Sequence, residues 1–178
     1  MLNDLARVMF DEAALAAKCR EMGQELSRDY AGKDLLAVGI LKGSMMFFAD
    51  LVRQIKVPLY IDFMAASSYG SGTETSGSVK IKKELDTDIR GRHVLLVEDI
   101  IDSGVTMSRL MAELAKREPA SIRLCALLSK PSRRQVDVQI DYCGFEVPDE
   151  FLVGYGLDYA EKYRNLPVIG VLKREIYS

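Results

Sequence analysis

Short, continuous apolar runs alternate with helix-like segments through the middle of this 178-residue chain. Leu35–Leu41, His93–Val97 and Ser121–Leu128 each have the length and apolar character of a strand that is buried on both faces. Between and after them, Met45–Gln54 and Met107–Lys116 have the pattern of helices. Strands that alternate with helices form parallel sheets covered by helices on both faces, so the sequence predicts an α/β fold.

Further elements are expected around this frame. Residues 11–30 have the spacing of an amphipathic helix that Asp11 could cap. Additional strands are expected at Pro58–Ala66, Val136–Tyr142, Phe151–Tyr155 and Val168–Leu172. The length of the chain and its hydrophobic content of 48% fit a single domain, residues 1–178, rather than two.

Residues 67–80 differ from the rest, because nearly every residue from Ser67 to Ser78 is small and polar. The segment predicts a long mobile loop, and loops of this length in compact domains often close over active sites. The alternative is a hairpin tip without a role.

Composition narrows the class of protein. The net charge of -2 gives no broad basic face, so no nucleic-acid partner is expected. The chain shows no leader peptide and no apolar run long enough to cross a bilayer, so no membrane partner is expected. Its three cysteines lack the spacing of a metal site or a disulfide framework. A reducing, cytoplasmic location follows.

Polar residues follow three of the predicted strands. Lys42 and Gly43 follow the first, Glu98–Asp99 follow the third, and Lys130 follows the fourth. Ligands of open α/β sheets bind at the carboxyl ends of the strands, so these residues are expected at one site. Carboxylates suit sugar hydroxyls or Mg²⁺, and as neighbours on a strand Glu98 and Asp99 would point to opposite sides. The alternative is a solvated acidic loop.

The segment Asp102–Thr106 leads into a predicted helix. Unpaired backbone N–H groups at a helix start bind anions, and a phosphate is the expected ligand. The alternative is that Asp102 or Ser103 only caps the helix. Three acids beside such a turn indicate a sugar phosphate, with phosphate on the turn and hydroxyls or a metal on the carboxylates.

Other phosphate and catalytic motifs do not match. The chain contains no P-loop, and the pattern that begins at Gly70 has Thr75 in place of the third glycine of a dinucleotide fingerprint. His93 is the sole histidine and lies at the wrong end of its strand. A Ser-His-Asp triad or a histidine metal site is therefore not expected.

Residues 94–106 closely resemble the phosphoribosyl-pyrophosphate motif of the type I phosphoribosyltransferase family, in its hypoxanthine-guanine branch. Four further segments agree in order: 41–44, 68–70, 130–131, and 151–159 with Arg164. The resemblance implies the type I phosphoribosyltransferase fold. That fold is a central, mostly parallel sheet flanked by helices, with a small hood formed by the N- and C-terminal segments.

The resemblance also implies roles for these residues. Glu98 and Asp99 would bind the ribose hydroxyls and a metal ion, and Asp102 would lie near purine N7 and accept a proton. The 5′-phosphate would be held by Ser103, Gly104, Val105 and Thr106. The pyrophosphate would be held by Lys42, Gly43, Arg164, Ser68 and Tyr69. In the family the peptide before this lysine is often cis, so a cis bond is expected at Leu41–Lys42.

The implied purine site lies further along the chain. Lys130 would donate to the purine 6-oxo group and so reject adenine, and Phe151 would stack on the ring. The backbone of Leu152 would meet the pairing edge, and Asp158 would contribute to the purine site and hold a second Mg²⁺.

The implied activity is Mg²⁺-dependent purine salvage by a homodimer or homotetramer. It would transfer the phosphoribosyl group from phosphoribosyl pyrophosphate to hypoxanthine or guanine. The alternatives are a regulator that senses phosphoribosyl pyrophosphate and a relative that prefers xanthine or adenine.

Overall fold

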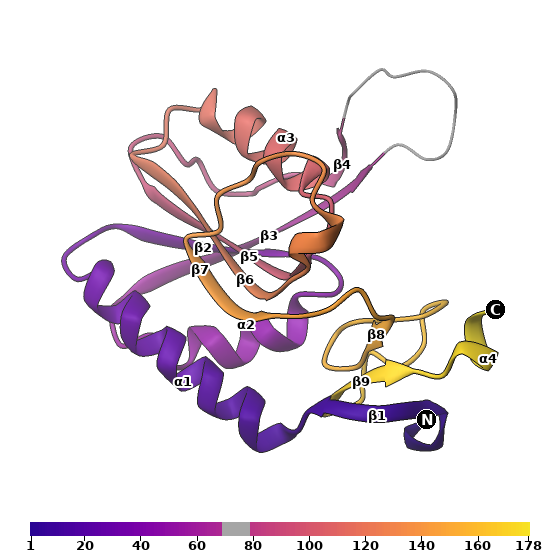
Figure 1. Cartoon of the computed structure of the whole chain (residues 1–178). Coiled ribbons are helices and arrows are strands. Elements are labelled where there is room, and N and C mark those ends of the chain that lie inside the picture. Colours follow the sequence, from indigo (N-terminus) through magenta and orange to yellow (C-terminus); the bar gives the residue numbers. More distant parts are fainter. Residues whose placement is uncertain (69–78) are drawn as a thin grey trace.

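A six-stranded sheet forms the centre of the computed structural model, which describes residues 1–68 and 79–178 (Figure 1). Its strand order is β4-β3-β2-β5-β6-β7. The strands are β2 (Leu35–Ile40), β3 (Leu59–Ser68), β4 (Val79–Lys83), β5 (His93–Ile101), β6 (Ser121–Ser129) and β7 (Tyr142–Glu146). Only the β3–β4 pair in this sheet is antiparallel. The mostly parallel sheet that the sequence predicted is confirmed.

Helices cover both faces of this sheet (Figure 1). α1 (Glu12–Asp29) and α2 (Met45–Val52) lie on one face, and α3 (Val105–Ala115) lies on the other. Alternation along β5 sends Leu95 into the core under α1 and α2, and Leu96 into the core under α3. Burial on both faces explains why the β5 sequence is apolar without interruption. No helix in the described ranges is long and apolar enough to cross a bilayer.

The two ends of the chain together form a second, smaller sheet of order β1-β9-β8. β1 (Leu5–Phe10) and β8 (Leu152–Val153) both pair antiparallel with β9 (Ile169–Leu172). A 3-10 turn (Leu2–Asp4) precedes β1, and the short helix α4 (Arg174–Tyr177) follows β9. This is the hood formed by the N- and C-terminal segments that the resemblance implied.

Two of the sequence expectations about strands are wrong in detail. No strand begins at Val136, because Val138 and Ile140 pack against the core under α3 without joining a ladder. Their alternation therefore reflects burial rather than strand pairing. The acids at 98–99 also lie within β5 rather than after it, since pairing with β6 continues to Ile101.

The predicted loop at residues 67–80 is shorter than expected at both ends. Ser67 pairs with Lys80 and Ser68 pairs with Val79, so these four residues extend β3 and β4. The remainder, residues 69–78, lies outside the described residues.

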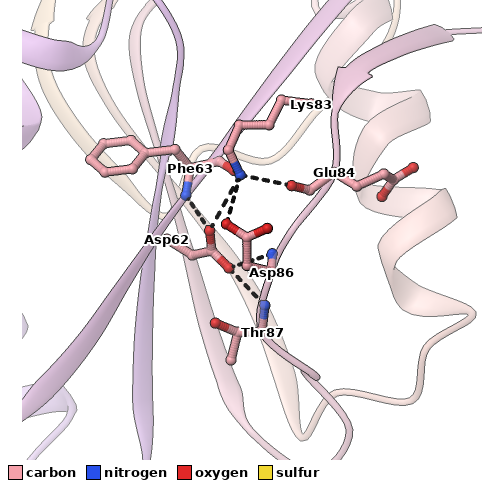
Figure 2. Close-up of polar contacts among 6 residues, drawn as sticks. All are labelled: Asp62, Phe63, Lys83, Glu84, Asp86 and Thr87. Atoms are coloured by element: carbon pink, nitrogen blue, oxygen red, sulfur yellow. Dashed lines mark hydrogen bonds and ion pairs between the residues drawn. The ribbon is translucent and has the colours of Figure 1, made fainter.

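Asp62 is a buried carboxylate in β3 that joins the strand to the segment following β4 (Figure 2). Its Oδ1 accepts the backbone N–H of Phe63 at 2.7 Å. Its Oδ2 accepts the backbone N–H groups of Asp86 and Thr87, each at 2.9 Å. The Lys83 ammonium lies 3.8 Å from Asp62 Oδ1. The Asp62 carboxylate thus ties β3 to the segment that follows β4. From this contact the two strands run to residues 68 and 79.

The charged form of this carboxylate is favoured in the folded protein. Burial acts to raise the pKa of Asp62, but the hydrogen bonds from Phe63, Thr87 and Asp86 outweigh it and hold the pKa below its ordinary value of 3.8. A carboxyl whose pKa is lowered by folding stabilises the fold above its unfolded pKa. That stabilisation is lost as the pH falls through the folded pKa.

The Asp62→Asn substitution tests this contact. It removes the charge and turns one acceptor oxygen into a donor that faces either backbone N–H groups or Lys83. We expect the free energy of unfolding to fall by about 1–3 kcal/mol at neutral pH. The difference from the parent protein should shrink in acid, where the parent loses the same charge. Urea unfolding at neutral and acidic pH measures both effects.

Asp86→Asn is the matched control, because that side chain is 85% exposed. Its free energy of unfolding should change by less than about 0.5 kcal/mol. Equal losses in the two variants would contradict the special role of Asp62.

Candidate active site

Two cavities open beside the carboxyl end of β5. The turn cavity, of about 310 Å³, is lined by Ala66, Glu98, Ile100, Ile101, Asp102, Ser103, Gly104, Thr106 and Met107. The aromatic cavity, of about 270 Å³, is lined by Asp99, Ile100, Asp102, Lys130, Phe151, Leu152, Leu157 and Asp158. Glu98 therefore faces one cavity and Asp99 the other, as their neighbouring positions on a strand predicted. Asp102 lines both cavities.

The carboxyls of Glu98 and Asp99 lie close together and are partly shielded from water. Desolvation, followed by repulsion from Asp99, raises the pKa of Glu98 well above its ordinary value. Desolvation also raises the pKa of Asp99, although hydrogen bonds act in the opposite direction. A cation beside the pair would favour the charged form of both carboxyls.

The turn that follows β5 places a glycine at the N-cap position of α3. Gly104 is the N-cap of α3 and has a φ of +79°, a conformation that favours glycine. Gly104 occupies the N-cap position, so the expectation that Asp102 or Ser103 is the N-cap residue is wrong. The Ser103 hydroxyl instead accepts the N–H of Val105 at 3.3 Å. The remaining N–H groups of the first turn of α3 lack intrahelical partners and suit an anion.

Arg134 holds this turn in place through hydrogen bonds, and it was not among the site residues predicted from the sequence. Its Nε donates to the backbone oxygen of Asp102 at 3.1 Å, and Nη2 donates to the Ser129 hydroxyl at 2.8 Å. The backbone N–H of Gln135 also donates to Ser103 O at 3.0 Å. The only signal in the sequence is an arginine four residues after Lys130, and that signal is weak.

Lys42 and Gly43 lie against the acidic end of β5. The Leu41–Lys42 peptide is cis, as expected. A Cβ added to Gly43 would lie 1.8 Å from Asp99 Oδ2, so any other residue here would displace this carboxylate. The Lys42 ammonium reaches Glu161 Oε2 at 2.9 Å. That pairing lowers the pKa of Glu161, which the sequence reasoning did not include.

Arg164 organises the segment that carries Asp158. It donates to the backbone oxygen of Gly156 at 2.7 Å and lies 3.0 Å from Asp158 Oδ1. It also reaches Glu161 Oε1 at 3.3 Å. Lys42 and Arg164, the two basic residues among the predicted pyrophosphate ligands, therefore both contact the exposed carboxylate of Glu161.

Lys130 and Phe151 meet in the aromatic cavity, although they lie on separate elements. Lys130 is buried, and its ammonium lies 3.8 Å from both Asp102 Oδ1 and Asp149 Oδ1. Phe151 is 36% exposed. Leu152 is buried in β8 and also lines the cavity. The structure thus brings the acid, the lysine and the aromatic ring of the predicted purine site together.

The structure describes only the backbone of Ser68 and does not describe Tyr69, the two site residues predicted from the loop. The backbone of Ser68 lies at the end of β3, whereas Tyr69 lies outside the described residues. Within the described ranges, no three His, Cys, Asp or Glu side chains form a group that could hold a metal ion. Mg²⁺ commonly takes one or two carboxylates and completes its shell with water and substrate oxygens. The pair Glu98 and Asp99 fits that requirement, since it offers two carboxyls at adjacent positions beside the cavities.

Comparison with known families gives a direct match. The model of the phosphoribosyl transferase domain matches residues 9–160 of the chain. The chain belongs to the phosphoribosyl transferase family. Curated relatives of this phosphoribosyltransferase include the hypoxanthine phosphoribosyltransferase of Salmonella typhimurium, which is 54% identical over 95% of this chain and 96% of the relative. The hypoxanthine-guanine phosphoribosyltransferase of Bacillus subtilis is 51% identical over 100% of this chain and 99% of the relative.

Another relative is much longer than this phosphoribosyltransferase. The bifunctional protein TilS/HprT of Listeria monocytogenes is 52% identical over the whole chain, which spans only 28% of that relative's length. Among solved structures, a hypoxanthine phosphoribosyltransferase from Staphylococcus aureus superposes with a TM-score of 0.96 at 49% identity, covering 100% of this chain and 97% of the other.

The Arg134→Met substitution tests whether the brace behind the turn matters. Methionine keeps an unbranched apolar stem but cannot hold the Asp102 backbone or the Ser129 hydroxyl. We expect kcat/KM with phosphoribosyl pyrophosphate and a 6-oxopurine to fall about ten-fold or more, because a misplaced acid is costly to catalysis. Arg133→Met is the matched control, since Arg133 is exposed and reaches only Asp149 at 3.5 Å. Steady-state kinetics that are equal in the two variants would contradict this role.

Proposed function

We propose that this chain transfers the phosphoribosyl group of phosphoribosyl pyrophosphate to hypoxanthine, and also to guanine, in purine salvage. The observation that carries the proposal is the position of Asp102. It lines both the turn cavity and the aromatic cavity, and it lies 3.8 Å from the Lys130 ammonium. A carboxylate in that position can reach a purine in one cavity while the phosphate of the same substrate complex rests in the other.

The turn cavity is proposed to bind the ribose 5-phosphate. Backbone N–H groups at the start of α3, and the hydroxyl groups of its turn, would hold the phosphate. Glu98, which also lines this cavity, would bind the ribose hydroxyls together with Asp99. The residues proposed for the phosphate are Ser103, Gly104, Val105 and Thr106.

Mg²⁺ is the proposed metal, held by Glu98 and Asp99 with water and substrate oxygens. A bound Mg²⁺ would neutralise charge that develops on the leaving pyrophosphate. Asp158 is proposed for a second ion, and it would need to exchange its contact with Arg164 for that ion. The two carboxylates of β5 would also orient the ribose through its hydroxyls.

Lys42, Gly43 and Arg164 are proposed to bind the pyrophosphate, with Ser68 and Tyr69 from the loop base. The geometry supports this, because Lys42 and Arg164 converge on one exposed carboxylate, that of Glu161. A pyrophosphate carries more negative charge and would replace Glu161 as their partner.

The base is proposed to lie in the aromatic cavity. Lys130 would donate to the 6-oxo oxygen, Phe151 would stack on the ring, and the Leu152 backbone would meet the pairing edge. The purine nitrogen attacks the ribose carbon as the bond to pyrophosphate breaks. Asp102 would take the proton that the purine loses in this step.

Assembly, compartment and domain organisation remain separate proposals. We propose a single domain over residues 1–178 that forms a homodimer or homotetramer in the cytoplasm. Light scattering coupled to size-exclusion chromatography gives the molecular mass of the assembly and decides its subunit number.

A panel of bases tests the proposed activity. Purified protein is incubated with Mg²⁺ and phosphoribosyl pyrophosphate, and nucleotide is measured with hypoxanthine, guanine, xanthine or adenine. We expect product with hypoxanthine and guanine and none with adenine, because the Lys130 ammonium would meet a donor rather than an acceptor. Absence of product from every base would overturn the enzyme proposal. Product from adenine alone would overturn the role of Lys130, and product from xanthine alone would identify a xanthine-preferring enzyme.

The Asp102→Asn substitution tests the proton-accepting role. We expect kcat to fall about 10²–10⁴-fold, because asparagine cannot accept the proton. Binding of phosphoribosyl pyrophosphate should change much less. Asp149→Asn is a matched control, since Asp149 has a similar exposure and lies at the same 3.8 Å from Lys130 but lines neither cavity. A defect that is mainly in binding, or one shared by both variants, would contradict the role.

A further inference from the structure

Phe151 belongs to a small aromatic cluster on the hood. Its ring stacks on that of Tyr177, with centroids 4.7 Å apart and planes at 26°. The ring of Tyr159 lies nearly perpendicular to it, at 5.6 Å and 87°. Phe151 lines the aromatic cavity, whereas Tyr159 and Tyr177 are not among the residues that line it. The two tyrosines therefore contact Phe151 without being part of the cavity lining.

Tyr177 is the penultimate residue, yet its position is fixed by several contacts. The backbone N–H of Lys173 donates to Asp4 O at 2.9 Å and so fastens the start of α4 to the N-terminal turn. Ile176 and Tyr177 pack against a hydrophobic cluster of the hood that includes Leu5 and Leu172. The N–H of Leu172 in turn donates to Phe151 O at 2.8 Å. Both ends of the chain thus hold the two stacked rings in place.

From this geometry we propose that Tyr177, supported by Tyr159, is a positioning residue for the purine base and acts through Phe151. The inference rests on the proposed function, since it concerns the base site of that reaction. The Tyr177 ring stacks on one face of Phe151, and the proposal assigns the other face to the base. A purine would then complete a stack of three rings.

The physical basis is preorganisation. A phenylalanine at the mouth of a cavity can rotate about its side-chain bonds, and a base that stacks on it must stop that rotation. Tyr177 and Tyr159 stop it before the base arrives. Because Tyr177 touches neither the phosphate turn nor the acids of β5, its removal should weaken binding of the base without affecting phosphoribosyl pyrophosphate.

The experiment compares Tyr177→Leu and Tyr177→Phe with the parent protein in steady-state kinetics. For Tyr177→Leu we expect the KM for hypoxanthine to rise about three- to ten-fold, which is the range of a lost aromatic pair. The KM for phosphoribosyl pyrophosphate should stay at the parent value. Tyr177→Phe keeps the ring and should restore the KM for hypoxanthine. Glu175→Ala, an exposed change in the same short helix, controls for disturbance of α4.

A double-mutant cycle with Phe151→Leu separates positioning from general structure. If Tyr177 acts through Phe151, adding Tyr177→Leu to Phe151→Leu should raise the KM for hypoxanthine no further. A further rise equal to that of the single variant would overturn the inference. An unchanged or lower KM in Tyr177→Leu would overturn it too, the lower value indicating that Tyr177 competes with the base. A parent protein that makes no nucleotide would instead overturn the proposed function, and this inference with it.

Discussion

Glu98 and Asp99 occupy neighbouring positions near the carboxyl end of β5, and strand geometry therefore sends their side chains to different cavities. This constraint organises the whole site. The turn that follows Glu98 and Asp99 can face one cavity, and the residues at the end of β6 and in the hood can face the other. Asp102, three residues beyond Asp99, then lies where the two cavities meet.

The same arrangement sets the electrostatics. Desolvation raises the pKa of both carboxyls, and repulsion from Asp99 adds to the rise for Glu98. Lys42, Arg164 and Lys130 approach the same edge from three different elements, each already paired with an acid. A ligand that carries phosphate groups and a divalent ion can replace these internal pairs on both sides. This charge distribution is the basis on which we propose a metal–pyrophosphate complex, rather than a neutral sugar, as the ligand.

The parts that could be predicted from the sequence are those with a strong local signal. β2, β5 and β6 are buried on both faces, so their apolar runs mark them directly. The approach of Lys130 to Asp102 also follows, because the carboxyl ends of neighbouring parallel strands meet at one edge.

The parts that were missed depend on contacts that no local pattern records. β4 alternates exposed lysines with half-buried residues, so it resembles a solvated charge run. β1 pairs with β9 across almost the whole chain. Arg134 reaches Asp102 through its backbone oxygen, and Tyr177 reaches Phe151 only after the two ends of the chain fold together. The sequence indicates the charged residues of the site. The residues that position them can be identified only from the three-dimensional structure.

A crystal structure of the protein with a purine nucleotide and Mg²⁺ tests the central claim most directly, because it locates both ends of the product. The account predicts the 5′-phosphate on the backbone of Ser103–Thr106, the base between Phe151 and Lys130, and Asp102 beside the imidazole ring of the purine. Another cavity, of about 490 Å³, lies between α1, α2 and the hood and carries Arg20 and Arg53. A nucleotide bound there, with the turn and aromatic cavities empty, would contradict the account.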